Sequence, residues 1–305
     1  MGEKELRRLI PIQAEWSIPQ LQENLAVALE GSGPALSTTP MSVSEVEENI
    51  ALVVSTSGST GAAKSVLISS AALIASTNAC HKYLGAVPGD SWSLLLPTTH
   101  IAGLNVLIRA TALGTRVIDN RNTNNYVDAD FISIVPTQLQ KALSGDERLL
   151  EHLTAAEAVL VGASALSDKL KKEAASKHIK VITTYGMTEM SGGCVYNQKP
   201  LDGVEIKVNS EGLIQLTGPM LATGYLDEKG NNMEISDSGW FESNDLGEFV
   251  NGSLKVLGRT DDVINSGGVI SNAGFITLMS SGAVFLSPMP VTSDPFLISI
   301  ITSLA

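Results

Sequence analysis

Short continuous runs of hydrophobic residues recur along the chain, and segments with helical periodicity separate them. The runs cover residues 50–54, 93–96, 131–135 and 158–161. Strands that are buried on both faces have continuous apolar runs of this kind, without strict alternation of polar and apolar positions. The pattern therefore predicts an α/β fold in which helices flank mainly parallel sheets.

Helices are predicted between the runs, for example near residues 71–84 and 167–177. The first 50 residues are predicted to hold one helix, which Ser17 caps at its start and Gly31 ends, followed by a linker rich in Gly, Ser and Pro.

After Gly203 the hydrophobic period changes from the helical value to two. Val204, Ile206 and Val208 alternate with polar residues, and Gly and Asp turns separate the segments that follow. Alternation of this kind is typical of antiparallel strands with one buried face. A small β-barrel-like subdomain is therefore predicted at about residues 203–258.

Composition restricts the classes of function. The 305 residues include 44% hydrophobic side chains, enough for a sizeable core, and carry a net charge of −12. A negative field of this size does not favour nucleic acid as a partner. No apolar stretch reaches 18 residues, so stable membrane insertion is not expected. Two distant cysteines without a CxxC motif, and no secretory leader, lead us to expect a cytoplasmic protein.

The segment 55–64, with the sequence S-T-S-G-S-T-G-A-A-K, carries the first chemical signal. Glycines allow backbone N–H groups to converge on an anion, hydroxyls add donors, and Lys64 supplies a positive charge. These groups suit a phosphate, although the lysine does not have the Walker A spacing. The alternative is an ordinary loop rich in Ser and Gly.

Further polar residues follow later strands in a fixed order. They are His100 after L-P-T-T, the Y-G-M-T-E segment 185–189, Asp245, and the G-R-T-D-D segment 258–262. Open α/β sheets bind ligands at such strand ends. With these elements the chain, over about residues 49–268, resembles the acyl-adenylate-forming superfamily of acyl-CoA synthetases, non-ribosomal adenylation domains and luciferases.

Within that superfamily the chain is most similar to the o-succinylbenzoate–CoA ligase family of menaquinone synthesis. The segments 101–109, 135–139 and 191–196 carry this narrower resemblance. It implies that small molecules are the partners: ATP and an aromatic acid that forms an acyl-adenylate, then CoA that accepts the acyl group, with Mg²⁺ as cofactor. A homodimer is left open.

The resemblance also implies residue roles. Lys64 and Thr188 would bind phosphate, Glu189 would hold Mg²⁺, and Asp245 would bind the ribose hydroxyls. The catalytic set implied is Lys64, His100, Thr188 and Glu189. The nucleotide-binding set implied is Thr56, Ser57, Gly58, Ser59, Thr60, Gly61, Lys64, Gly162, Ala163, Ser164, Tyr185, Gly186, Met187, Thr188, Asp245 and Arg259.

His100 and Arg109 are the expected substrate-binding residues. Arg109 is the only charged residue between Asp90 and Arg116 and lies in a predicted apolar helix. A buried guanidinium requires an anionic partner, and succinylbenzoate has a second carboxylate besides the one that is activated. The alternatives are that Arg109 reaches the surface or pairs with a protein acid, and that His100 is a packed core histidine.

The C-terminal segment departs from the family. The predicted domains are 1–258, the AMP-binding N-terminal domain, and 259–305, a hinge at Asp261 with an atypical, truncated tail. No Lys or Arg follows Arg259, and residues 263–293 carry no charge. The C-terminal domain, with the lysine that the family uses in adenylation, is therefore expected to be largely absent. A shifted reading frame, a decayed gene product, a partner-binding segment and a membrane hairpin remain open as explanations.

Three functions stay open from the sequence. The main hypothesis is an o-succinylbenzoate–CoA ligase whose activity is impaired by the missing lysine. The alternatives are a ligase for another aryl or fatty acid, and a catalytically inactive nucleotide-binding protein.

Overall fold

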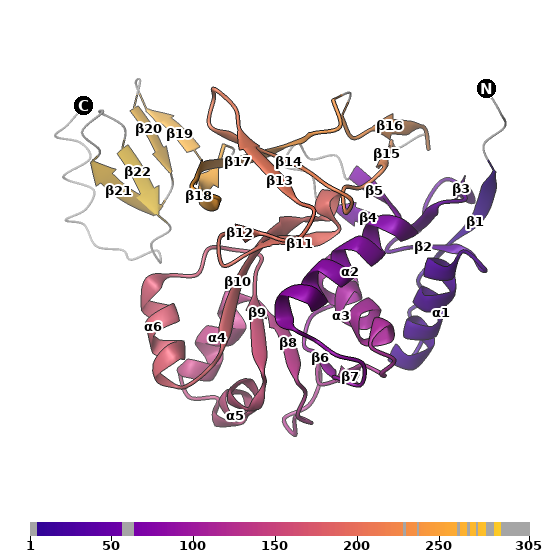
Figure 1. Ribbon diagram of the computed structural model, residues 1–305, viewed down its shortest axis with the longest axis horizontal. Helices are drawn as coiled ribbons and strands as arrows, with labels where there is room; N and C mark the ends of the chain where they lie inside the picture. The colour runs from indigo at the N-terminus through magenta and orange to yellow at the C-terminus, as the bar shows by residue number, and fades with distance from the viewer. Residues whose placement is uncertain are drawn as a thin grey trace.

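Three large β-sheets, two two-stranded sheets and six α-helices form the part of the chain that the structure describes (Figure 1). The computed structural model describes residues 5–56, 64–227, 230–236 and 238–260, and beyond them the backbone of four short strands. These four strands pair antiparallel in twos and are β19 (Val263–Ser266), β20 (Val269–Asn272), β21 (Gly274–Leu278) and β22 (Val284–Ser287).

The first sheet has seven strands in the order β16-β15-β5-β4-β2-β1-β3. Only the β1–β2 and β2–β4 pairs are parallel. The strands are β1 (Leu6–Pro11), β2 (Ala35–Ser37), β3 (Glu45–Glu47), β4 (Ile50–Thr56), β5 (Lys64–Ser69), β15 (Gly224–Leu226) and β16 (Asn232–Glu234). The prediction of one helix and a linker for the first 50 residues was therefore incomplete, because three strands of this sheet flank the predicted helix.

The second sheet contains the predicted parallel core. Its order is β12-β11-β10-β9-β8-β6-β7, and the five strands from β10 to β7 are parallel. The strands are β6 (Trp92–Leu94), β7 (Ile118–Asp119), β8 (Phe131–Ile134), β9 (Ala158–Val161), β10 (Val181–Met187), β11 (Gly192–Tyr196) and β12 (Lys199–Pro200). Buried β-branched and aromatic side chains on both faces explain their continuous apolar runs.

Helices cover both seven-stranded sheets, which confirms the predicted α/β class. They are α1 (Ile18–Glu30), α2 (Ser70–Leu84), α3 (Ile101–Ala112), α4 (Pro136–Leu143), α5 (Glu147–Ala155) and α6 (Asp168–Ser176). In Figure 1, α1, α2 and α3 lie together beside the first sheet, and α4, α5 and α6 lie around β8, β9 and β10. The predicted caps are present: Ser17 accepts a hydrogen bond from Gln20 N, and Gly31 adopts φ 78°.

The third sheet is antiparallel, with the order β13-β14-β17-β18. Its strands are β13 (Glu205–Val208), β14 (Leu213–Thr217), β17 (Phe241–Val250) and β18 (Ser253–Arg259). The change of period after Gly203 thus predicts antiparallel strands correctly. However, β15 and β16, from the same stretch of sequence, belong to the first sheet, because Tyr225 of β15 pairs with Val66 of β5.

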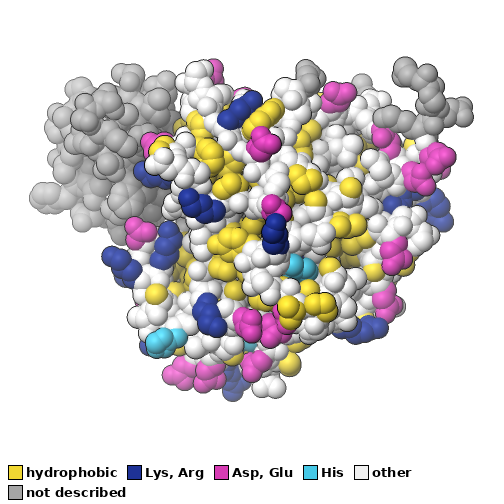
Figure 2. Space-filling model, viewed as in Figure 1, with side chains coloured by type: hydrophobic (Ala, Val, Ile, Leu, Met, Phe, Trp, Pro, Cys, Tyr) yellow, Lys and Arg dark blue, Asp and Glu magenta, His cyan; other side chains and the backbone are white. Residues whose placement is uncertain are grey.

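One hydrophobic core joins the three sheets. It includes Leu52 from β4, Leu104 and Leu107 from α3, Phe131 from β8 and Ile214 from β14, all at most 1% exposed. No described helix is long and apolar enough to cross a bilayer. On the face shown in Figure 2, acidic and basic side chains are interspersed and no broad basic surface forms.

The Ser- and Gly-rich segment differs from its prediction in one respect. It lies between the strand predicted at residues 50–54 and the helix predicted near residues 71–84, but it connects the antiparallel neighbours β4 and β5, with Thr56 directly opposite Lys64. Residues 64–69 form a strand because their backbone pairs with β4 on one side and with β15 on the other, and the helix begins only at Ser70.

Candidate functional site

A cavity of about 420 Å³ lies where the three sheets meet. Lys64 at the start of β5 and Tyr225 of β15 come from the first sheet, Met187 ends β10 of the second, and Asp245 comes from β17 of the third. The complete lining is Lys64, Met187, Glu189, Tyr225, Ile235, Ser236, Trp240, Phe241, Glu242, Ser243, Asn244, Asp245 and Arg259. The cavity thus brings together five of the residues predicted from the sequence, which are 64, 187, 189, 245 and 259.

Two polar side chains, those of Tyr185 and Arg259, lie next to Asp245. The phenol of Tyr185 donates a hydrogen bond to Asp245 Oδ2 at 2.7 Å, and Arg259 Nη1 lies 3.7 Å from Asp245 Oδ1. The Arg259 contact follows from strand pairing, since the two residues are opposite one another in the β17–β18 ladder. Burial, with the nearby Asp245 carboxylate, raises the pKa of Tyr185 far above its usual range, so the phenol remains a donor at neutral pH.

Glu189 lies in a single turn of 3₁₀ helix, Thr188–Met190, directly after β10. Tyr225 donates a hydrogen bond from its hydroxyl to Glu189 Oε1 at 3.1 Å. The Lys64 ammonium lies 5.4 Å from the centroid of the Tyr225 ring, within the range of a cation–π interaction. Tyr225 was not predicted as a site residue, because its neighbours in the sequence form no recognisable motif.

Close backbone packing fixes the direction in which Glu189 leaves β10. The β10–β11 register shifts between Tyr185 and Gly186, and a side chain at position 186 would collide with the carbonyl oxygen of Gly192. Ser191 then adopts φ 54°, and its N–H donates to Thr188 O at 2.9 Å. Gly186 is therefore required for packing, which explains its place in the predicted motif.

Gly162, Ala163 and Ser164, a loop of the predicted nucleotide-binding set, follow β9, the parallel neighbour of β10. A side chain at Gly162 would collide with the Thr184 hydroxyl, so this loop lies against the strand that carries Tyr185. Ala163 has φ 73°, a conformation that favours glycine. None of the three residues lines the cavity.

His100 is exposed and occupies the position before the first turn of α3. Its interpretation as a packed core histidine is therefore wrong. The first turns of α3 contact the segment after Glu189, since Asn105 Nδ2 donates to Ser191 O at 2.8 Å. His100 does not itself line the cavity.

Arg109 is buried, with 4% of its surface exposed, so it does not reach solvent. Its Nη2 donates to the Tyr196 hydroxyl at 3.3 Å, and its guanidinium carbon lies 5.2 Å from the Trp92 ring centroid. Among the described residues, no carboxylate lies within 4.0 Å of Arg109, and its Nε has no hydrogen-bond partner. Arg109 therefore neither reaches the surface nor pairs with an acidic side chain of the described residues. It does not line the cavity.

Six of the predicted residues lie outside the described part of the chain, and they are Ser57, Gly58, Ser59, Thr60, Gly61 and Asp261. Thr56 and Lys64, which lie on either side of residues 57–63, are described. Thr56 donates from its hydroxyl to the carbonyl oxygen of Lys64 at 3.3 Å.

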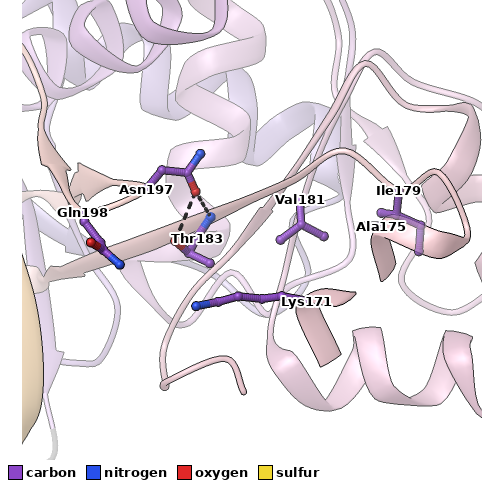
Figure 3. A pocket seen from close by; sticks show the side chains of 7 residues that line it. All are labelled: Lys171, Ala175, Ile179, Val181, Thr183, Asn197 and Gln198. Atoms are coloured by element: carbon purple, nitrogen blue, oxygen red, sulfur yellow. Dashed lines mark hydrogen bonds between the residues drawn. The ribbon is translucent and has the colours of Figure 1, made fainter. Parts of the chain in front are cut away.

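A second cavity, of about 250 Å³, lies between α6, β10 and the turn from β11 to β12 (Figure 3). Lys171 and Val181 line it together with Thr183 and Asn197. Asn197 Oδ1 accepts hydrogen bonds from the N–H and the hydroxyl of Thr183, at 2.9 and 3.1 Å. These two hydrogen bonds fasten the β11–β12 turn to β10. No predicted site residue lines this second cavity.

The chain is similar to known proteins in sequence and in fold. Residues 4–226 match the family model described as AMP-binding enzyme. A Mycobacterium tuberculosis protein named "Probable 2-succinylbenzoate--CoA ligase" is 37% identical over an alignment of 277 residues, which covers 82% of this chain and 70% of that protein. The 2-succinylbenzoate–CoA ligase of Lactococcus lactis is 30% identical, over 73% of this chain and 52% of its own length.

Solved structures agree on the fold. The o-succinylbenzoate CoA synthetase of Bacillus subtilis, in complex with the acyl-adenylate intermediate OSB-AMP, matches with a TM-score of 0.67 and 23% identity. The same enzyme with ATP and magnesium ion matches with a TM-score of 0.66. Each match covers 87% of this chain and 66% of the solved chain. The matched family model and the 37% identical relative show that this chain belongs to the AMP-binding enzymes and, among them, to the 2-succinylbenzoate–CoA ligase family.

Proposed function

We propose that the chain activates 2-succinylbenzoate with ATP and transfers the acyl group to CoA, a step of menaquinone synthesis. The observation that carries this proposal is the convergence of Lys64, Glu189 and Asp245 on one cavity, in a chain 37% identical to a named ligase of this kind. Lys64 begins β5 of the first sheet, Glu189 follows β10 of the second, and Asp245 lies in β17 of the third. Each of the three has the chemistry that one part of MgATP requires.

The first half-reaction joins the acid to AMP. A carboxylate oxygen of the acid attacks the α-phosphorus, and the bond from that phosphorus to pyrophosphate breaks. We propose that Lys64 and the N–H groups near Thr188 bind the phosphate oxygens, where they stabilise the charge that develops in the transition state. Asp245, oriented by Tyr185, would accept hydrogen bonds from the ribose hydroxyls.

The second half-reaction forms the thioester. The CoA sulfur attacks the acyl carbonyl carbon, the thiol loses its proton, and AMP leaves. His100, exposed at the start of α3, and Arg109, buried in the same helix, are the residues proposed for binding the acid. Arg109 suits this role chemically, because a buried guanidinium without a protein carboxylate requires an anion.

Magnesium fits the residues present. Among the described residues, no group of three or more His, Cys, Asp or Glu side chains could hold a metal ion. Mg²⁺ is usually held by one or two carboxylates together with substrate phosphates, so Glu189 suits it without a further protein ligand. Glu189 would hold the ion, which offsets phosphate charge when bound.

Mass spectrometry of a reaction with the purified chain, ATP, Mg²⁺, 2-succinylbenzoate and CoA tests the proposal. Thioester formation is expected, and Glu189→Gln, purified identically, should give none and thereby exclude a contaminating ligase. Adenylate without thioester would restrict the function to the first half-reaction. Neither product, from a chain that binds ATP, would contradict the proposal and favour the inactive nucleotide-binding protein. Thioester with monocarboxylates alone would favour a ligase for another acid.

A further inference from the structure

Tyr225 contacts two charged residues of the cavity at the same time. Its hydroxyl donates to Glu189 Oε1 at 3.1 Å, and its ring lies under the Lys64 ammonium at 5.4 Å. The two charged residues have opposite sign, and no ion pair within 4.0 Å joins them. Tyr225 thus lies between an anion and a cation that would otherwise attract each other.

Strand pairing explains how Tyr225 reaches both. In the antiparallel β15–β5 ladder Tyr225 is opposite Val66 and Leu226 is opposite Ser65, so Lys64 is a diagonal neighbour of Tyr225. Diagonal neighbours lie within reach when one side chain is aromatic and the other is long.

The other contact depends on the segment before β15. The N–H of Ala222 donates to the carbonyl oxygen of Glu189 at 2.8 Å, and the N–H of Thr223 donates to Leu67 O at 2.9 Å. These bonds fasten the 3₁₀ turn of Glu189 to the first sheet. The position of the Tyr225 hydroxyl relative to Glu189 is therefore set by backbone contacts as well as by its own hydrogen bond.

We infer that Tyr225 is a positioning residue that keeps Lys64 and Glu189 separate and oriented for phosphate and Mg²⁺, respectively. The inference rests on the proposed function. The phenol occupies one acceptor position of Oε1 and leaves Oε2 and the other lone pair of Oε1 for the metal. The ring holds the ammonium by its face and forms no hydrogen bond with it, so all three N–H donors of Lys64 remain available for phosphate oxygens.

Two substitutions separate the two contacts. Tyr225→Phe removes the hydroxyl and keeps the ring, whereas Tyr225→Leu removes both. Calorimetric titration with ATP, once with Mg²⁺ and once with EDTA, gives two dissociation constants. Their ratio is the metal-dependent tightening of ATP binding. We expect Tyr225→Phe to reduce this tightening about tenfold and to leave ATP affinity in EDTA unchanged, because only the bond to a charged group is lost. Tyr225→Leu should also weaken ATP binding in EDTA, by about threefold.

Tyr83→Phe is the matched control. The Tyr83 hydroxyl also takes part in one hydrogen bond, from Asn197 Nδ2 at 3.3 Å, but it does not line the cavity. Tyr83→Phe should leave the affinity for ATP unchanged, both with Mg²⁺ and with EDTA. If Tyr225→Leu fails to fold, Tyr225→Phe alone decides the question.

The outcomes distinguish this inference from the proposed function. An unchanged metal-dependent tightening in Tyr225→Phe, while the unaltered chain binds MgATP, overturns the positioning role only. Equal losses with Mg²⁺ and with EDTA in Tyr225→Phe also overturn it, because they indicate a merely structural role. An unaltered chain that does not bind MgATP overturns the proposed function, and the inference with it.

Discussion

The hydroxyl of Tyr185 lies 2.7 Å from Oδ2 of Asp245, although 60 positions separate the two residues in the sequence. The bond joins β10 of the second sheet to β17 of the third. It holds the Asp245 carboxylate at the wall of the cavity, with Arg259 on its other oxygen. The proposed ribose site therefore depends on the packing of two sheets against each other.

Asp245→Asn should weaken ATP binding about tenfold and leave 2′,3′-dideoxy-ATP binding unchanged. A carboxylate accepts from both ribose hydroxyls, whereas an amide offers one acceptor and presents donors to the other hydroxyl. Calorimetry with both nucleotides measures the effect. Glu242→Gln, at another carboxylate of the cavity wall, should preserve the preference for ATP. Equal losses for both nucleotides would exclude Asp245 from ribose recognition.

Arg109→Met should weaken 2-succinylbenzoate binding by about 30-fold or more and change ATP affinity little. The loss of one partner from a buried charge pair has a cost of this size. Methionine keeps much of the volume beside Trp92 and Tyr196, so the fold is expected to survive.

Benzoate is the matched ligand for this prediction, because it lacks the second carboxylate. Its affinity should be similar in both proteins. Equal losses of ATP and succinylbenzoate affinity in Arg109→Met would reject Arg109 as a substrate-binding residue.

His81 should make the protein less stable in mild acid. Burial and the nearby Arg109 charge lower the pKa of His81 from 6.5 to about 4, against a smaller opposing effect of Asp90. The unfolded chain binds a proton as the pH falls below 6.5, but the folded chain does not until about pH 4. The contribution of His81 to the free energy of unfolding is therefore retained above pH 6.5 and declines by about 1.4 kcal/mol per pH unit between pH 6.5 and about pH 4.

Urea unfolding between pH 7 and pH 4.5 measures this decline. The free energy of unfolding of His81→Gln should fall less steeply with decreasing pH than that of the unaltered protein, by about 1.4 kcal/mol per pH unit. His178→Asn, at an exposed histidine, should be as steep as the unaltered protein. Parallel curves for all three proteins would contradict the expected effect of His81.

Ala163→Gly should stabilise the protein by about 0.5 kcal/mol. The residue has φ 73°, where a Cβ destabilises the folded state by about 1–2 kcal/mol, and glycine removes this strain. Glycine also increases the conformational entropy of the unfolded chain, which offsets part of the stabilisation. Urea unfolding at pH 7 provides the comparison. Ala165→Gly, two residues away and without a positive φ, should instead be destabilising, and a loss in both variants would refute the strain at 163.

The parallel strands could be predicted because their apolar runs reflect burial on both faces, which is a local property. The strand β5 was missed for a nonlocal reason. Residues 64–69 continue directly into α2, and only their pairing with β4 on one side and β15 on the other makes them a strand. Tertiary pairing overrides local periodicity at such positions.

Lys64, Glu189 and Arg259 could be predicted because each belongs to a motif of contiguous residues, whereas Glu242 of the same cavity belongs to none and was not predicted. Tyr225 could not, because its role depends on the β15–β5 register and on the turn after β10, and both are set by distant segments. Gly224, directly before it, was the only nearby signal: a side chain there would collide with the Met233 carbonyl oxygen.

The insertion of β15 next to β5 has a consequence for synthesis of the chain. All strands of the second sheet lie between residues 92 and 200, so this sheet is complete while β15 has not yet left the ribosome. Until residue 226 emerges, the N–H and C=O groups on one side of β5 lack their partner strand. Exposed strand edges of this kind associate with other chains. A nascent or prematurely terminated polypeptide that stops before β15 should therefore aggregate, whereas one that extends through β16 should not.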